Sequence, residues 1–324
     1  MKKIIFTLLL VFILGGCNLD QSINDYEGNK TQPVEKTPVG DTPIVTVPQK
    51  TPVEPGEGTP VDPGNNPTQP GTTDPNIITK KVGNLTISSL IGDGYSKSGS
   101  NLIFTKAGEY TISGSYEGSL VFNVSTMESV TLYLNNVTIT ALYNHAIYWT
   151  SSSGKIEIKA MENTVNEITV LADSTSLFSA IESENNIEIG GSGKLTVKGL
   201  QRHAVKGSNI EIKGHVDLTV EAVKDGLHGK QIIITGGNTK INNCTDAIQA
   251  DINSNDAKGT ILIEEGVLTI TNCKRAFRAT TSLTIQVVAG GTLEINVNNT
   301  KTPIEVPEVY YVSGTFKING VNYQ

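Results

Sequence analysis

The sequence predicts an all-β fold over residues 76–324, a single-stranded parallel β-helix of roughly ten coils. Two observations carry this prediction. Short runs with apolar residues at alternate positions are separated by glycine or asparagine, which is a pattern of strands rather than helices. Equivalent runs also recur at a spacing near 22 residues, and a fixed period in this range is typical of solenoids.

Three apolar ladders show the repeat. The first has steps of 23, 22, 29 and 22 residues and consists of Ile189, Ile212, Ile234, Ile263 and Ile285. The second joins a small residue to a larger apolar one and consists of Ala180-Ile181, Ala204-Val205, Gly226-Leu227, Ala247-Ile248 and Ala276-Phe277. The third consists of Leu195, Leu218, Leu268 and Leu293. Ladders in register predict stacked coils that share one core, because a single coil buries little by itself.

Two other architectures fit the sequence less well. A leucine-rich repeat would carry a fixed Asn/Leu consensus, which this sequence lacks. A β-sandwich would not keep three ladders in register. We therefore expect three strands per coil and no helix.

The 29-residue step indicates an insertion at residues 251–258. It also places Cys244 on Cys273 and Asn243 on Asn272 in neighbouring coils, which lie ~4.8 Å apart. A disulfide tolerates Cα separations of about 4.4–6.8 Å, so a disulfide and two buried thiols are both open. The asparagines predict a hydrogen-bond ladder that holds a turn.

Residues 1–16 have the features of a lipoprotein signal peptide. Two lysines precede an apolar run at 4–14, which is shorter than the about 20 residues that span a bilayer. The run ends in Leu-Gly-Gly-Cys, which makes Cys17 the predicted lipidation site; the alternative is an ordinary secretory signal with a chance cysteine. Two acyl chains anchor a protein firmly, so we expect it on the extracellular face of the cell membrane, held there by its lipid alone.

Residues 17–30 form the lipidated N-terminus, and residues 31–75 form a Thr/Pro-rich linker. The linker contains 11 of the 13 prolines, which predicts a disordered chain that is partly polyproline II. Fully extended at ~3.1 Å per residue it would reach on the order of 140 Å, a length that suits a spacer through a Gram-positive-like cell wall. The rest of the chain holds 23 acidic and 20 basic residues, so it lacks the excess of positive charge that would indicate nucleic-acid binding. We expect a monomer.

Two rows of polar residues accompany the second ladder. Neighbouring residues of a strand face opposite sides, so the residue after each inward apolar residue points outward. These residues are Tyr148, Glu182, Lys206, His228, Gln249 and Arg278. The residues just before the small ones are His145, Ser179, His203, Asp225, Asp246 and Arg275. We interpret both rows as one external strip, which holds three of the four histidines in a nearly neutral domain.

This strip is the candidate site. Its candidate ligand-binding residues are His145, Tyr148, His203, His228, Arg275 and Arg278. Tyr148 is placed to stack on a sugar ring, whereas Trp149 should face the core and His215 the surface on a different strand. The sequence shows no nucleophile motif, zinc motif or phosphate loop.

Asp225 and Asp246 fall on consecutive coils, about 5 Å apart if stacked. Two such anions repel, so either one is protonated or a cation lies between them. In a secreted protein the hard, oxygen-ligated cation is usually calcium, and Asp251 of the insertion could approach as a further ligand. The alternative is that Lys224 or Arg275 neutralises the pair.

Several motifs in a fixed order resemble a family of secreted carbohydrate-binding domains of cellulolytic clostridia. They are GEYTISG at 108–114, VTLYLNNVTI at 130–139, AIY at 146–148, ENTVN at 162–166, GSGKL at 191–195, KDGL at 224–227 and DAI at 246–248. The resemblance covers about residues 83–297. It implies a right-handed β-helix similar to pectate lyases, with calcium at Asp225 and Asp246. The chain departs from the family at His145, His203 and Arg275, where an acidic residue is often expected.

The family resemblance implies binding to cellulose or polygalacturonate without demonstrated lyase activity. Our leading hypothesis is therefore a non-catalytic module for plant or microbial polysaccharide, with calcium bridging an acidic ligand and Arg275 and Arg278 pairing with uronates. The second hypothesis is a polysaccharide lyase in which Arg275 or Arg278 removes a proton acidified by calcium. The third is a structural or adhesion stalk without a sugar site.

Overall fold

The computed structural model describes residues 76–323 except residues 93, 125–126, 151–153, 174, 176 and 253–258. The predicted signal peptide, the lipidated N-terminus with Cys17 and the linker lie outside the described residues, as does most of the 251–258 insertion. No helix in the described part of the chain is long and apolar enough to cross a membrane.

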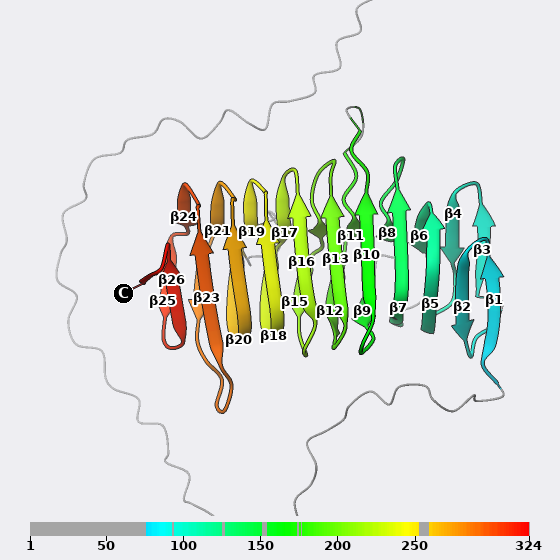
Figure 1. Cartoon of the computed structure of the whole chain (residues 1–324), viewed down its shortest axis with the longest axis horizontal. Coiled ribbons are helices and arrows are strands. Elements are labelled where there is room, and N and C mark those ends of the chain that lie inside the picture. Colours follow the sequence, from blue (N-terminus) through cyan, green and yellow to red (C-terminus); the bar gives the residue numbers. More distant parts are fainter. Residues whose placement is uncertain are drawn as a thin grey trace, which may run out of the picture. The chain divides into compact units, whose positions relative to one another are not determined.

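The described chain is an all-β parallel solenoid, which confirms the predicted fold class (Figure 1). One sheet of ten strands contains β3 (Tyr95–Ser98), β4 (Asn101–Phe104), β6 (Ser119–Phe122), β8 (Ile147–Trp149), β11 (Ile181–Ser183), β14 (Val205–Lys206), β17 (Asp225–Gly229), β19 (Asp246–Ala250), β21 (Arg275–Ala279) and β24 (Thr302–Glu305).

The other sheet has 17 strands. They are β1 (Ile78–Val82), β2 (Leu85–Ser89), β5 (Gly108–Glu117), β7 (Val130–Ala141), β9 (Lys155–Ala160), β10 (Val165–Val170), β12 (Asn186–Gly191), β13 (Lys194–Gly199), β15 (Asn209–Ile212), β16 (Asp217–Ala222), β18 (Gln231–Asn242), β20 (Thr260–Thr271), β22 (Ser282–Ile285), β23 (Leu293–Asn298), β25 (Glu308–Tyr311), β26 (Thr315–Ile318) and β27 (Val321–Asn322). A typical coil gives this sheet two short strands, such as β12 and β13, whereas β18 and β20 run through both positions with a β-bulge.

The solenoid has about seven turns, fewer than the roughly ten expected. Antiparallel pairings flank the parallel coils at both ends. At the N-terminal end β1 pairs antiparallel with β2 and β3 with β4, and β2 pairs antiparallel with β5. At the C-terminal end β26 pairs antiparallel with β27.

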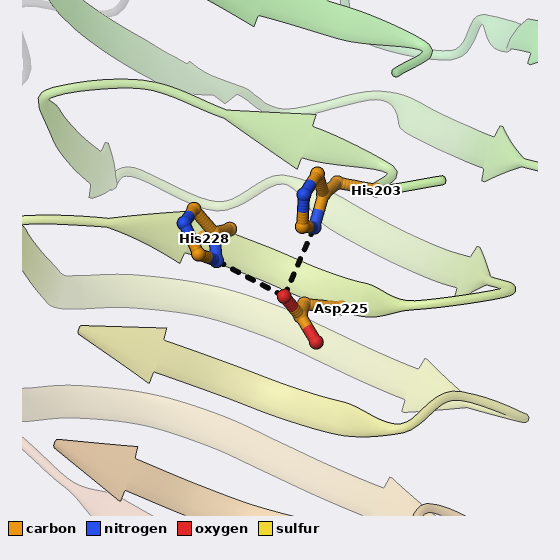
Figure 2. A group of neighbouring side chains, drawn as sticks. All are labelled: His203, Asp225 and His228. Atoms are coloured by element: carbon orange, nitrogen blue, oxygen red, sulfur yellow. Dashed lines mark hydrogen bonds and ion pairs between the residues drawn. The ribbon is translucent and has the colours of Figure 1, made fainter. Parts of the chain in front are cut away.

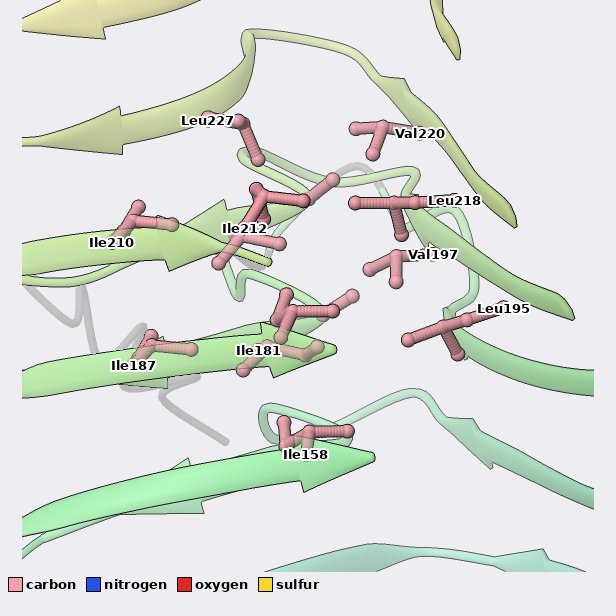
Figure 3. Packing of buried hydrophobic residues seen from close by; sticks show 14 of the residues in the cluster. Ile158, Ile181, Ile187, Leu195, Val197, Ile210, Ile212, Leu218, Val220 and Leu227 are labelled. Atoms are coloured by element: carbon pink, nitrogen blue, oxygen red, sulfur yellow. The ribbon is translucent and has the colours of Figure 1, made fainter. Parts of the chain in front are cut away.

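The apolar ladders form the core between the two sheets (Figure 3). On the ten-stranded sheet Ile181 pairs in register with Ile147 and Val205, and the same ladder continues through Leu227 and Ile248. All five side chains are fully buried. The period of the sequence therefore corresponds to one turn of the solenoid.

Cys244 and Cys273 form a disulfide between neighbouring coils, with their Cα atoms 4.6 Å apart. Beside it, Asn272 Nδ2 donates a 3.4 Å hydrogen bond to Asn243 Oδ1, and Asn299 Nδ2 donates to Asn272 Oδ1. The three asparagines have φ between 51° and 58°, a left-handed turn conformation that asparagine tolerates better than most residues. The predicted asparagine ladder is confirmed, and the disulfide decides between the two alternatives left open for the cysteines.

Candidate functional site

An outer row of side chains follows the outward face of the ten-stranded sheet. Strand pairing places Tyr148, Glu182, Lys206, His228, Gln249, Arg278 and Glu305 in register on successive coils. Adjacent members are therefore separated by the strand spacing, ~4.8 Å. Most members are partly exposed, whereas Gln249 is buried.

The second predicted row is not external, which corrects the interpretation of one exposed strip. This inner row consists of His145, Ser179, His203, Asp225, Asp246 and Arg275. His203 and Asp225 are 0% exposed and Asp246 is 1% exposed. The pairing of β17 with β19 keeps one register, and Asp225, two residues before the inward Leu227, lies on the same side of the strand, with its carboxylate against His228. The inner row is thus packed beneath the outer row.

His203, Asp225 and His228 form the first cluster between the two rows (Figure 2). His228 Nδ1 forms a 3.0 Å hydrogen bond with Asp225 Oδ2. His203 Nδ1 lies 3.0 Å from the same oxygen, but not in the orientation of a hydrogen bond. The two imidazole rings are 4.5 Å apart between centroids.

The electrostatics of this cluster follow from its burial. Burial lowers the pKa of His203 to about 4, although the neighbouring Asp225 carboxylate opposes the shift. Burial by itself would raise the pKa of Asp225, but the two histidines outweigh it and hold that pKa below its ordinary value. At neutral pH the cluster therefore contains a neutral His203 beside an ionised Asp225.

Asp246, Arg275, Arg278 and Glu305 form the second cluster. Arg275 binds Asp246 through two hydrogen bonds, from Nε to Oδ1 at 2.5 Å and from Nη2 to Oδ2 at 2.9 Å. Arg278 Nη1 lies 3.5 Å from Asp246 Oδ2, and Arg275 Nη1 donates to Glu305 at 3.1 Å. Arg275 therefore neutralises the Asp246 carboxylate, as one of the alternatives for the aspartate pair predicted.

His145 and Tyr148 lie together several coils away from these clusters. Their rings are 4.7 Å apart, and His145 Nδ1 accepts a 3.1 Å hydrogen bond from the Ser179 backbone N–H. Burial lowers the pKa of His145, whereas Glu182 at 3.4 Å opposes this. Tyr148 is partly exposed, as stacking on a sugar ring would require.

The placements expected for two other residues are confirmed. Trp149 is fully buried in the core, and His215 is exposed.

The six candidate ligand-binding residues divide among three places along the solenoid rather than forming one site.

The residues predicted to hold calcium do not fit that ion. Calcium takes six to eight oxygen ligands, approximately. Asp225 is flanked by two imidazoles, and both oxygens of Asp246 are hydrogen-bonded to Arg275. Asp251 Oδ2 accepts a 2.5 Å hydrogen bond from Gln249. We therefore derive no role for calcium at these carboxylates, and calcium binding elsewhere stays a prediction.

Asp251 also lines a surface pocket of about 490 Å³. Lys206 and His228 of the outer row line the same pocket, together with Glu184 and Lys230. The pocket therefore lies directly against the first cluster, through the 21% exposed side chain of His228. Its mixed charged lining is suited to a polar ligand.

Glu305 is the main member of the site that sequence reasoning missed. It pairs with Arg278 in register and lies 3.6 Å from the Arg278 Nε atom. Its coil has Pro303 in place of the small alanine of the second ladder, which conceals the repeat. One further step of the outer row beyond Arg278 would have found it.

The fold and these rows define a class of protein, a β-solenoid that presents a polar face on one of its sheets. Residues 98–317 match a family described as carbohydrate-binding domain-containing proteins. The chain belongs to this family, which confirms the resemblance noted from its motifs. Residues 1–18 match the prokaryotic membrane lipoprotein lipid attachment site, in agreement with lipidation at Cys17.

A solved structure is also similar to this chain. It is the polysaccharide lyase-like protein from C. thermocellum, determined as a gadolinium derivative, with 26% identity and a TM-score of 0.59. The similarity covers 70% of this chain and 90% of that one. A search of curated proteins gives no match.

Proposed function

We propose that this protein is a lipid-anchored surface protein whose solenoid binds polysaccharide along the outer row. Membership of a carbohydrate-binding family and the lipid attachment site support the proposal. The observation that carries it is the outer row itself, because it places polar and charged side chains at every coil along one sheet face. A repeating face of this kind is suited to an extended polymer.

Arg278 and the pocket beside Lys206 favour an acidic polysaccharide. The Arg278 side chain is 40% exposed, so part of its guanidinium faces solvent, where it can bind a uronate carboxylate. Lys206 pairs with Glu182 at 2.7 Å and also lines the pocket. The domain as a whole is mildly acidic, so these local cations are what would attract such a ligand.

Arg275 is poorly suited to act as the base of a lyase. Its hydrogen bonds with Asp246 raise the pKa of Arg275, its burial opposes this, and its hydrogen bond with Glu305 raises the pKa further. A base must lose its proton, and these contacts stabilise the protonated form. The structure therefore favours binding over lyase chemistry through Arg275.

Binding to a panel of polysaccharides tests the proposal. The mature chain carrying Cys17→Ser, which lacks the acyl attachment site, is mixed with polygalacturonate, cellulose and a neutral glucan. We expect retention of polygalacturonate and a loss of about tenfold or more in affinity in Arg278→Gln, since a charge-assisted hydrogen bond contributes about 1.5–3 kcal/mol. Lys240→Gln, on the opposite sheet, is the matched control and should bind normally.

Each outcome separates the hypotheses. No retention on any polysaccharide would support the stalk hypothesis, and unsaturated product absorbance would support the lyase hypothesis. Equal loss in Arg278→Gln and Lys240→Gln would place binding away from the outer row. Repeating the assay with calcium and with a chelator tests the predicted calcium dependence.

A further inference from the structure

Three metal-ligating side chains converge at the first cluster. Among the described residues, His203, Asp225 and His228 are the group whose ligand atoms all lie within 4.8 Å of one another. Asp225 and His228 belong to β17, and His203 comes from the turn before β14 in the preceding coil (Figure 2). The stacking of coils therefore assembles the group from residues that are 25 positions apart at most.

The spacing of the ligand atoms suits a small divalent ion. Both Nδ1 atoms lie 3.0 Å from Asp225 Oδ2. Bonds of about 2.0–2.2 Å to nitrogen and oxygen place two ligand atoms about 2.9–3.5 Å apart at octahedral to tetrahedral angles. Small side-chain rotations would bring all three atoms around one ion.

Unpartnered polar atoms give an independent sign of a ligand. His203 is fully buried, and its Nδ1 has no hydrogen-bond partner although it lies 3.0 Å from Asp225 Oδ2. Asp225 Oδ1 is also buried without a partner. A buried polar group without a hydrogen-bond partner lowers the stability of the fold. Binding of a ligand by these atoms would explain why the cluster retains them. A metal ion would accept the lone pair of Nδ1 directly.

We propose that His203, Asp225 and His228 bind a divalent transition metal of the zinc type. Two imidazole nitrogens and one carboxylate oxygen suit zinc and its neighbours, whereas calcium prefers oxygen ligands alone. Three protein ligands leave one tetrahedral position open. His228 lines the pocket with Lys206 and Asp251, so the metal has a route from solvent. This site does not depend on the proposed polysaccharide binding.

Metal titration with matched histidine variants tests the site. The Cys17→Ser chain is stripped with chelator and titrated with Zn²⁺ by calorimetry, with bound metal counted by mass spectrometry. We expect one Zn²⁺ per chain, no competition from excess Ca²⁺, and a loss of at least about a hundredfold in affinity in His228→Gln, since even outer-shell changes cost about 10–100-fold. His215→Gln removes an exposed histidine and should leave the affinity unchanged.

A second measurement needs no substitution. The chain has four histidines, so their imidazole nitrogens can be followed individually by NMR in the unaltered protein. One equivalent of Zn²⁺ should shift the Nδ1 signals of His203 and His228 and leave those of His145 and His215 in place. Absence of stoichiometric binding, equal affinity in His228→Gln and the parent chain, or unshifted His203 and His228 signals would each overturn the proposal.

Discussion

The substitution Gly226→Ala tests whether the sequence repeat or the packing around residue 226 decides its effect on the stability of the solenoid. The second ladder has alanine at the equivalent position in the neighbouring coils, at Ala204 and Ala247. By the repeat alone, alanine at 226 would restore the pattern and stabilise the fold by about 0.4–1 kcal/mol, because it restricts the unfolded chain. The structure predicts the opposite sign.

The predicted loss follows from the space around Gly226. A Cβ atom there would lie 2.6 Å from Ile241 Cγ2 and 2.7 Å from the backbone oxygen of Ala247. Both distances are shorter than side chains tolerate, and the backbone oxygen is held within β19. Overpacking of this kind costs about 1–3 kcal/mol, so we expect net destabilisation by about 1–2 kcal/mol. Asp225 precedes Gly226, so the same shift should disturb the first cluster.

Urea unfolding followed by far-UV circular dichroism measures this effect. Gly226→Ala should lower the midpoint without changing the slope, which reports the surface exposed on unfolding. Gly291→Ala is the matched control, because its nearest contact is the exposed Val288 side chain at 3.1 Å. Its effect should stay within about 0.5 kcal/mol. A midpoint for Gly226→Ala at or above that of the parent chain would refute the reasoning from contact distances.

Two further predictions concern charged groups. Arg275→Met leaves the buried Asp246 carboxylate with only a 3.5 Å contact to Arg278. The free energy of unfolding should therefore fall by about 3 kcal/mol. The double variant with Asp246→Asn should recover part of the lost stability, because it also removes the buried charge. Burial raises the pKa of Glu157, but Lys155 and Lys159 outweigh it and lower that pKa to about 2. The contribution of Glu157 is thus complete above its unfolded-state pKa of about 4.3 and is lost as the pH falls toward 2. Urea midpoints measured from pH 5 to pH 2 should therefore decline less steeply in Glu157→Gln, and equal slopes would contradict this assignment.

The outer row was predictable from sequence because it depends on local alternation. A strand turns successive side chains to opposite faces, and the repeat carries that alternation from coil to coil. The apolar ladder through Ile181 and Val205 therefore predicts the outward placement of Lys206 and His228 that the structure shows. The same argument identified Trp149 as a core residue.

The depth and partners of the inner row depend on the tertiary structure. Alternation places Asp225 on the same side of its strand as the inward Leu227, but only the tertiary structure shows that its carboxylate lies against His203 and His228. Repeat spacing allows Asp246 to approach either a cation or Arg275, and the folded structure shows two hydrogen bonds from Arg275 to Asp246.

The sequence by itself determined the class of fold, the register of its coils and the lipid attachment site, because each depends on a local or repeated sequence pattern. Only the tertiary structure decided that Cys244 and Cys273 are bonded, that the solenoid ends in hairpins, and that the histidines flank a buried carboxylate. These features depend on distances between coils and on burial. Residue spacing limits such quantities without determining them.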